Sequence, residues 1–250
     1  IPFDVIDRDL ILPVGRKKII TIPGVRRCGK STLMEITINS LVKSGVPREN
    51  ILWLGFDDER LINMTSEELD VVITSYMEMF PDTPIKDIYM FFDEIQLIKD
   101  WEYFVLRVYK SYCKNIYLCG SNATMLSTEL SSALRGYPLE YKAYPLSFNE
   151  YCRFKGINTN SYLEQDKAKL RITFDVYIKQ SSFPEVVLTE SRWEQLKLLH
   201  GYFDTMLLKD LAEHYKISNI HVLRFFVKRI MGNLTKPTSI NAIYKDIKSQ

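Results

Sequence analysis

Residues 24–32 constrain the fold of this chain more than any other segment. They read Gly-Val-Arg-Arg-Cys-Gly-Lys-Ser-Thr and match the pattern G-x-x-x-x-G-K-[ST] at every fixed position. An isoleucine-rich run precedes the pattern at residues 17–22, and residues 30–44 repeat apolar side chains at helical spacing. The pattern therefore lies between a predicted strand and a predicted helix, which is the context of a phosphate-binding loop.

Each fixed position of this loop has a chemical reason. Glycines 24 and 29 let the backbone wrap N–H groups around an anion, and the helix N-terminus that follows favours negative charge. Lys30 is placed to reach the β and γ phosphates of a nucleotide, and the Ser31 hydroxyl is a hard ligand suited to Mg²⁺. We therefore predict that ATP and Mg²⁺ bind at Gly24, Val25, Arg26, Arg27, Cys28, Gly29, Lys30, Ser31 and Thr32.

Length and composition indicate how large a core the protein can form and in which compartment it is expected. With 250 residues, 46% of them hydrophobic, the chain is large enough for one substantial core, with or without a smaller second domain. The cysteines show no C-x-x-C spacing and are read as reduced thiols of a cytoplasmic protein: Cys28, Cys113, Cys119 and Cys152. No apolar run reaches the length of a membrane span, and the first residues lack the layout of a secretion signal.

Strand-like and helical segments alternate over the first part of the chain. Further strands are predicted at residues 51–56, 88–92 and 116–119, which are apolar throughout, and a fifth strand at residues 139–144. This pattern predicts an α/β fold with a parallel sheet covered on both faces. From about residue 160 the sequence is read as helical, with helices near 166–180, 191–215, 218–231 and 238–248. Capping-box spacings open helices at Thr65 and Ser147.

Two carboxylates follow the predicted strand at residues 88–92. Asp93 and Glu94 would lie beside the phosphate loop, because ligands of such sheets bind at the carboxyl ends of the strands. We predict that Asp93 holds the magnesium shell and that Glu94 orients and deprotonates an attacking water. A surface pair of acidic residues is the alternative interpretation. The upstream loop favours the catalytic one.

Asn122 follows the next predicted strand and has two interpretations. It could sense the γ phosphate and the attacking water, or it could cap the helix at residues 123–127. One residue is able to do both. We favour the sensor role because the adjacent strand ends at the same edge of the sheet.

Five segments together resemble a group of prokaryotic AAA+ ATPases in which the ATPase domain precedes a winged helix and a nuclease-like domain. They are residues 24–31, 91–96, 119–122, 134–136 and 144–151. The resemblance implies a P-loop NTPase sheet in the order 5-1-4-3-2, an all-helical lid, and Arg135 as an arginine finger acting on a neighbouring subunit of a homo-oligomer. A surface arginine beside a turn at Gly136 is the alternative interpretation of Arg135. Ser181 and Ser182 stand where the group commonly has two glycines.

The resemblance also suggests three parts of the chain. Residues 1–158 would form the ATPase core, residues 159–234 the helical lid, and residues 235–250 the start of a truncated winged helix. We predict an ATP-hydrolysing molecular switch or remodelling ATPase whose catalytic residues are Glu94, Lys30, Asn122 and Arg135.

A nucleic-acid-binding module, in which hydrolysis only resets the bound state, is the alternative function. Residues 209–250 contain 8 Lys and Arg against 3 Asp and Glu, which would suit DNA bound by this region and by the missing C-terminal part. A solvated basic helix face explains the same charge. A transporter ATPase fits less well because no Ser-Gly-Gly signature follows the loop. A small-molecule kinase is also weaker because Asp93 and Glu94 suit attack by water better.

Overall fold

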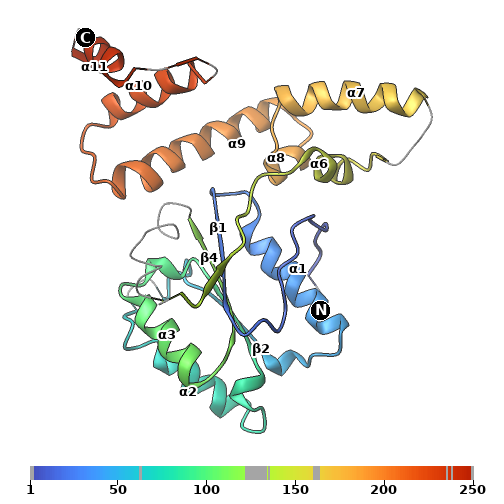
Figure 1. The fold of residues 1–250 in the computed structure, drawn as a ribbon, viewed down its shortest axis with the longest axis vertical. Coiled ribbons are helices and arrows are strands. Elements are labelled where there is room, and N and C mark those ends of the chain that lie inside the picture. Colours follow the sequence, from blue (N-terminus) through green and yellow to red (C-terminus); the bar gives the residue numbers. More distant parts are fainter. Residues whose placement is uncertain are drawn as a thin grey trace. The chain divides into compact units, whose positions relative to one another are not determined.

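A computed structural model describes residues 3–61, 64–121, 134, 136–159, 164–234, 236–237 and 239–248. The chain forms two compact units, Ile1–Glu190 and Ser191–Gln250. Figure 1 shows the ribbon coloured along the sequence. None of the described helices combines the length and apolar character needed to cross a bilayer.

The described part of the first unit contains a five-stranded parallel sheet. Its strands are β1 (Ile19–Gly24), β2 (Ile51–Gly55), β3 (Tyr89–Asp93), β4 (Asn115–Ser121) and β5 (Pro138–Glu140). They are arranged in the order β2-β3-β4-β1-β5, and all four neighbouring pairs run parallel. The α/β fold and the predicted strand order are therefore confirmed.

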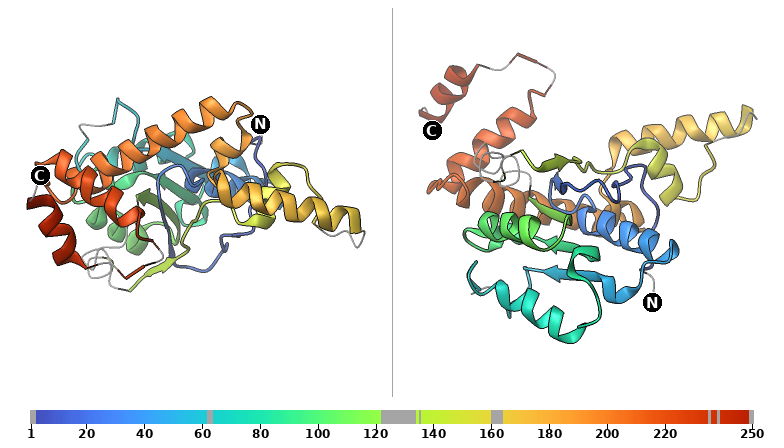
Figure 2. Two further views of the ribbon diagram at one scale, coloured as in Figure 1. Left: turned by 90° about the horizontal axis from the view of Figure 1, so that it is seen from above. Right: turned by 60° about the horizontal axis from the view of Figure 1, so that its bottom comes forward.

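The inner strands β1 and β3 are largely apolar and buried because helices cover both faces of the sheet, whereas the edge strand β5 is mostly exposed. On one face, Ile20, Ile22 and Phe91 pack in a core with apolar side chains of α1 (Lys30–Lys43). On the other face, Ile19 and Phe92 pack with α2 (Asp70–Met79) and α3 (Trp101–Ser111). This two-sided cover is visible in Figure 1 and again in the views of Figure 2. Short 3-10 turns complete this part at η1 (Arg48–Asn50), η2 (Ile85–Asp87) and η3 (Ile95–Leu97).

The fifth strand is shorter than predicted. Only Pro138–Glu140 forms a ladder with β1, whereas we expected a strand over residues 139–144. The chain continues beside β1, because the amides of Tyr141 and Ala143 donate to the carbonyls of Thr21 and Pro23, both at 2.8 Å. Pro23 has no N–H to return a hydrogen bond, so the ladder is interrupted there.

Beyond the sheet, the described residues of the first unit form three further helices. They are α6 (Phe148–Phe154), α7 (Glu164–Lys179) and α8 (Pro184–Leu188), and the last of these was not predicted. Leu146, Tyr151 and Val187 form a small separate core between them. The predicted capping box at Ser147 is present with both reciprocal hydrogen bonds to Glu150. Thr65 and Glu68 exchange the corresponding hydrogen bonds, but α2 begins only at Asp70, so the prediction that Thr65 opens this helix is wrong.

The second unit is helical over its described residues. It contains α9 (Arg192–Thr205), a π-helical segment η4 (Met206–Glu213), α10 (Ile220–Met231) and α11 (Ile240–Lys248). Leu207, Ala212 and Leu223 form its core. The helix predicted for residues 191–215 is thus present but changes to π geometry at Met206. The predicted division at residues 158 and 234 stays a prediction.

Candidate nucleotide site

The phosphate-loop sequence lies between the carboxyl end of β1 and the start of α1. Gly29 precedes the helix with a φ of 94°, a left-handed conformation that favours glycine. Gly24 is required for a different reason, since a Cβ there would lie 2.6 Å from the Ala143 carbonyl oxygen. The glycines thus permit a sharp turn at one end of the loop and a close backbone approach at the other.

Lys30 begins α1 and is only 5% exposed. Its ammonium donates hydrogen bonds to the carbonyl oxygens of Gly24 (3.1 Å) and Val25 (3.3 Å), so it spans the loop. Ser31 and Thr32 follow in the first turn and are half-buried. Amides of a first helical turn have no partner within the helix, and they carry the positive end of its dipole. The loop therefore combines a cation with amide donors, which suits a phosphate.

Asp93 is the last residue of β3 and is 8% exposed. Its Oδ1 accepts a hydrogen bond from the Cys119 thiol on the neighbouring strand β4. Burial, together with the negative charge of Asp93, raises the pKa of Cys119 well above its usual value. Cys119 is consequently a neutral thiol that donates to this carboxylate.

Glu94 follows Asp93 in a left-handed conformation with a φ of 51°, which is uncommon for a residue other than glycine. Its backbone amide donates to the Cys119 carbonyl at 3.1 Å. Its carboxylate Oε2 accepts a hydrogen bond from the Gln96 side-chain amide. The Oε1 of Gln96 is buried and has no hydrogen-bond partner among the described residues. Glu94 is therefore held at a strained turn at the end of β3, and Gln96 orients its carboxylate.

Glu35 is a residue of this site that the sequence analysis did not select. It lies four residues after Ser31 on α1, which puts both on one side of the helix. Partial burial and the nearby charge of Asp93 raise the pKa of the Glu35 carboxyl. The helix that follows the loop is thus within electrostatic reach of Asp93. The four-residue spacing between Ser31 and Glu35 is the sequence feature that could have indicated Glu35 as a site residue.

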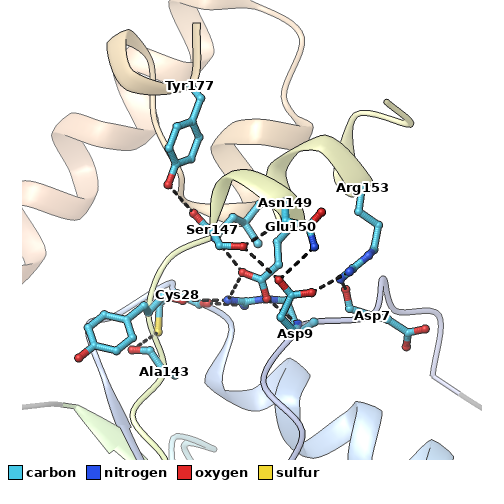
Figure 3. A network of polar contacts seen from close by, with 12 residues as sticks. Asp7, Asp9, Cys28, Ala143, Ser147, Asn149, Glu150, Arg153 and Tyr177 are labelled. Carbon is cyan, nitrogen blue, oxygen red and sulfur yellow. Dashed lines mark hydrogen bonds and ion pairs between the residues drawn. The ribbon is translucent and has the colours of Figure 1, made fainter. Parts of the chain in front are cut away.

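Arg8 and Glu150 were missed as well. Arg8 forms a buried ion pair with Glu150 at 2.7 Å and also donates to the loop carbonyl of Cys28 at 2.9 Å. The bonds from Arg8 to Cys28 and to Glu150, and the bond from the Ser147 amide to Glu150, are among the dashed lines in Figure 3. Burial raises the pKa of Glu150, but hydrogen bonds from Arg8 and from the Ser147 and Asp9 amides outweigh it, so the pKa is lowered. No spacing in the sequence relates Arg8 to Glu150.

The sheet brings most of the predicted site residues to one edge. The loop follows β1, whereas Asp93 and Glu94 follow β3, and β4 lies between these two strands. Asn122 and Arg135 lie outside the described residues.

The residues at this edge fit a magnesium nucleotide. The described residues contain no group of three or more His, Cys, Asp and Glu side chains that could hold a metal. Magnesium sites in nucleotide-binding proteins commonly use one or two protein ligands, with phosphate oxygens and water completing the shell. Ser31 and Asp93 offer such ligands, and the loop offers donors to the phosphates.

A parallel sheet with this loop after β1 and two carboxylates at the end of β3 defines the P-loop class of α/β proteins. The sequence profile of a family described as "AAA domain" matches residues 16–152. The chain belongs to this family. A second profile, described as a domain of unknown function (DUF8612), matches residues 171–250.

Two curated proteins resemble most of the chain. An uncharacterized protein of Methanocaldococcus jannaschii is 32% identical over 231 residues, which cover 92% of this chain and 50% of that protein. An uncharacterized protein of Haemophilus influenzae is 34% identical over 224 residues, covering 88% and 53%. The chain spans about half the length of the curated relatives it matches. Among solved structures, that of C. elegans PCH-2 aligns with a TM-score of 0.42 and 14% identity, covering 79% of this chain and 63% of PCH-2.

Proposed function

We propose that this chain binds ATP with Mg²⁺ and hydrolyses it to ADP and phosphate, as an AAA+ switch or remodelling ATPase. One observation carries the proposal: the phosphate loop and the Asp93–Glu94 pair lie at the same edge of one parallel sheet. Membership of the AAA domain family supports it.

Binding rests on the loop. Lys30 would exchange its hydrogen bonds with the Gly24 and Val25 carbonyls for oxygens of the β and γ phosphates. The first-turn amides of α1 would hold the same phosphates at the positive end of the helix dipole. Ser31 and Asp93 would hold Mg²⁺, which neutralises charge on the phosphate oxygens when bound.

Hydrolysis rests on Glu94. Its carboxylate would orient a water molecule and accept a proton as the water oxygen bonds to the γ phosphorus. The bond from the γ phosphorus to the bridging oxygen breaks, and ADP leaves with that oxygen. Gln96 already orients this carboxylate through its side-chain amide. We assign Asn122 as the sensor of the γ phosphate and Arg135 as a finger supplied by a second copy of the chain.

The test compares ATP binding in matched variants. Labelled ATP is titrated into wild type, Lys30→Ala, and Lys43→Ala, which removes an exposed lysine at the other end of the same helix. We expect Lys30→Ala to lose binding by about 100-fold or more, because it removes the cation that the loop pattern places beside the β and γ phosphates. Lys43→Ala should bind as wild type does. Equal affinity of Lys30→Ala and wild type would remove the phosphate site from this loop.

DNA binding by the second unit is a second candidate function. Within α10, three cations and no acidic residue occur between Ile220 and Met231, namely Arg224, Lys228 and Arg229. Arg224 is paired with Asp204 at 2.5 Å, which leaves the last turn as the most basic part of the helix. Anisotropy of a labelled duplex, measured against salt with ADP and with ATP, tests this candidate. Binding that falls with salt and changes with the nucleotide supports it, whereas no binding by the full-length protein excludes it.

A further inference from the structure

Arg8 is a buried cation on the N-terminal segment that precedes β1. Its side chain is 4% exposed, although it belongs to a segment without regular secondary structure. Its Nε and Nη2 donate to the two carboxylate oxygens of Glu150 at 2.7 and 3.3 Å, and Nη2 also donates to the Tyr144 carbonyl at 2.9 Å. The remaining terminal nitrogen, Nη1, donates to the Cys28 carbonyl at 2.9 Å. Arg8 thus joins the N-terminal segment and residues 144–150 to the phosphate loop.

The hydrogen bond from Arg8 to the Cys28 carbonyl fixes the orientation of the Cys28–Gly29 peptide plane. The peptide between Cys28 and Gly29 is trans and planar, so its carbonyl and its N–H point in opposite directions. Because the carbonyl points to Arg8, the Gly29 N–H points away from Arg8. The guanidinium also packs directly against Gly29, since a Cβ at that residue would lie 2.9 Å from Nη1. Rotation of this peptide would therefore break a buried hydrogen bond.

Glu150 fixes the guanidinium in turn. Its Oε1 also accepts from the Asp9 amide, and its Oε2 from the Ser147 amide, each at 2.8 Å. The Ser147 bond is one half of the capping box of α6, so the carboxylate is tied to the start of that helix. Four donors in fixed positions leave the carboxylate a single orientation, and the planar fork of Arg8 follows it.

We propose that Arg8 is a positioning residue of the phosphate loop, holding the Cys28–Gly29 peptide so that the Gly29 N–H is preset to donate to a bound phosphate. The inference rests on the proposed nucleotide site and concerns how that site is organised. Without Arg8 the peptide would rotate between orientations, and binding would require the donor to be ordered each time.

The competing explanation is that Arg8 only stabilises the fold. A variant of Arg153 distinguishes the two explanations. Arg153 lies on α6 and also anchors the N-terminal segment, through the Asp7 carbonyl at 2.8 Å and the Asp9 carboxylate at 2.7 Å. Its hydrogen bonds go to Asp7 and Asp9 rather than to the loop, and Figure 3 shows it on the far side of Asp9 from Cys28. Replacing Arg153 thus loosens the same segment without touching Cys28.

The experiment measures the dissociation constant of MgADP by displacement of a labelled nucleotide from the whole chain. We expect Arg8→Lys to raise this dissociation constant about tenfold, because a lysine ammonium cannot donate to the Glu150 carboxylate and the Cys28 carbonyl at the same time. Arg153→Lys should change it by less than about twofold. The thermal midpoint, recorded in parallel, shows whether a loss of affinity merely follows a loss of stability.

A double variant keeps the test valid where Arg8→Lys does not fold. Arg8→Gln combined with Glu150→Gln removes both charges together, so no unpaired charge stays buried. It should bind MgADP about tenfold more weakly than wild type. Binding within twofold of wild type by a folded Arg8 variant overturns the inference, as does an equal loss in Arg153→Lys. Lys30→Ala, run alongside, separates the two proposals: if it alone loses binding, the nucleotide site stands and the role of Arg8 falls.

Discussion

Replacing Glu150 by Gln tests how far the Arg8–Glu150 pair holds the first unit together. The carboxylate accepts four hydrogen bonds, from Arg8 Nε, Arg8 Nη2, the Asp9 amide and the Ser147 amide. An amide of the same shape has one acceptor oxygen in place of two, so two of these donors lose their acceptor. Arg8 would stay buried with its charge unbalanced.

The loss of unfolding free energy expected for Glu150→Gln follows from the burial of the ion pair. Removing one partner of a buried ion pair costs about 3–5 kcal/mol, because the charge that remains is desolvated without compensation. Arg8 keeps its bonds to the Cys28 and Tyr144 carbonyls, which argues for the lower end of that range. A loss of about 3 kcal/mol lowers the melting midpoint of a unit of this size by roughly 6–12 °C.

Urea unfolding followed by tryptophan fluorescence measures this loss in the first unit alone. Trp193 belongs to the second unit and is 69% exposed, so Trp193→Phe serves as the common background and leaves Trp53 and Trp101 as reporters. The control is Asp9→Asn, which removes the half-exposed partner of Arg153 and should cost about 0–1 kcal/mol. A loss below about 0.5 kcal/mol in Glu150→Gln would refute the view that this pair is a buried, mutually dependent unit.

Four further outcomes are expected. Gly24→Ala should weaken nucleotide binding at least about tenfold, because its Cβ would lie 2.6 Å from a carbonyl oxygen, and calorimetric titration checks this. Asp93→Asn should bind ATP but need more Mg²⁺ for half-maximal phosphate release; an unchanged requirement would count against a metal role. Arg135→Ala should lower turnover by about 10³-fold, and mixing with Glu94→Gln subunits should restore part of it if the arginine acts in trans. The pKa of Glu150 is lowered in the folded state from 4.5, so the ionised carboxylate stabilises the fold above that pH, and this stabilisation is lost as the pH falls. Glu150→Gln should therefore make the melting midpoint depend less on pH below about pH 4.5.

The sheet and its carboxyl edge were predictable because they depend on local signals. Apolar runs bounded by glycine and acidic residues marked the strands, and the loop pattern marked the turn into α1. Asp93 and Glu94 could be assigned because strand ends of a parallel sheet meet at one edge. The strand order itself came from the family resemblance, since apolar runs do not say which strands are neighbours.

The missed features depend on contacts between distant segments. Arg8 and Glu150 are 142 residues apart, so no periodicity relates them. The early end of β5 follows from a missing N–H on Pro23, a residue of β1 rather than of β5. Gln96, which orients Glu94, is only two residues away in the sequence. The contact nevertheless depends on the left-handed backbone at Glu94, which the presence of a glutamate does not predict.

Phosphate release from MgATP by Glu94→Gln, measured beside ATP binding by the same protein, tests the central claim most directly. The account predicts that the variant binds ATP within about twofold of wild type and that its turnover falls by about 10²-fold or more, because the group that accepts the proton of the attacking water is gone. Turnover equal to that of wild type in a variant that still binds ATP would contradict the account.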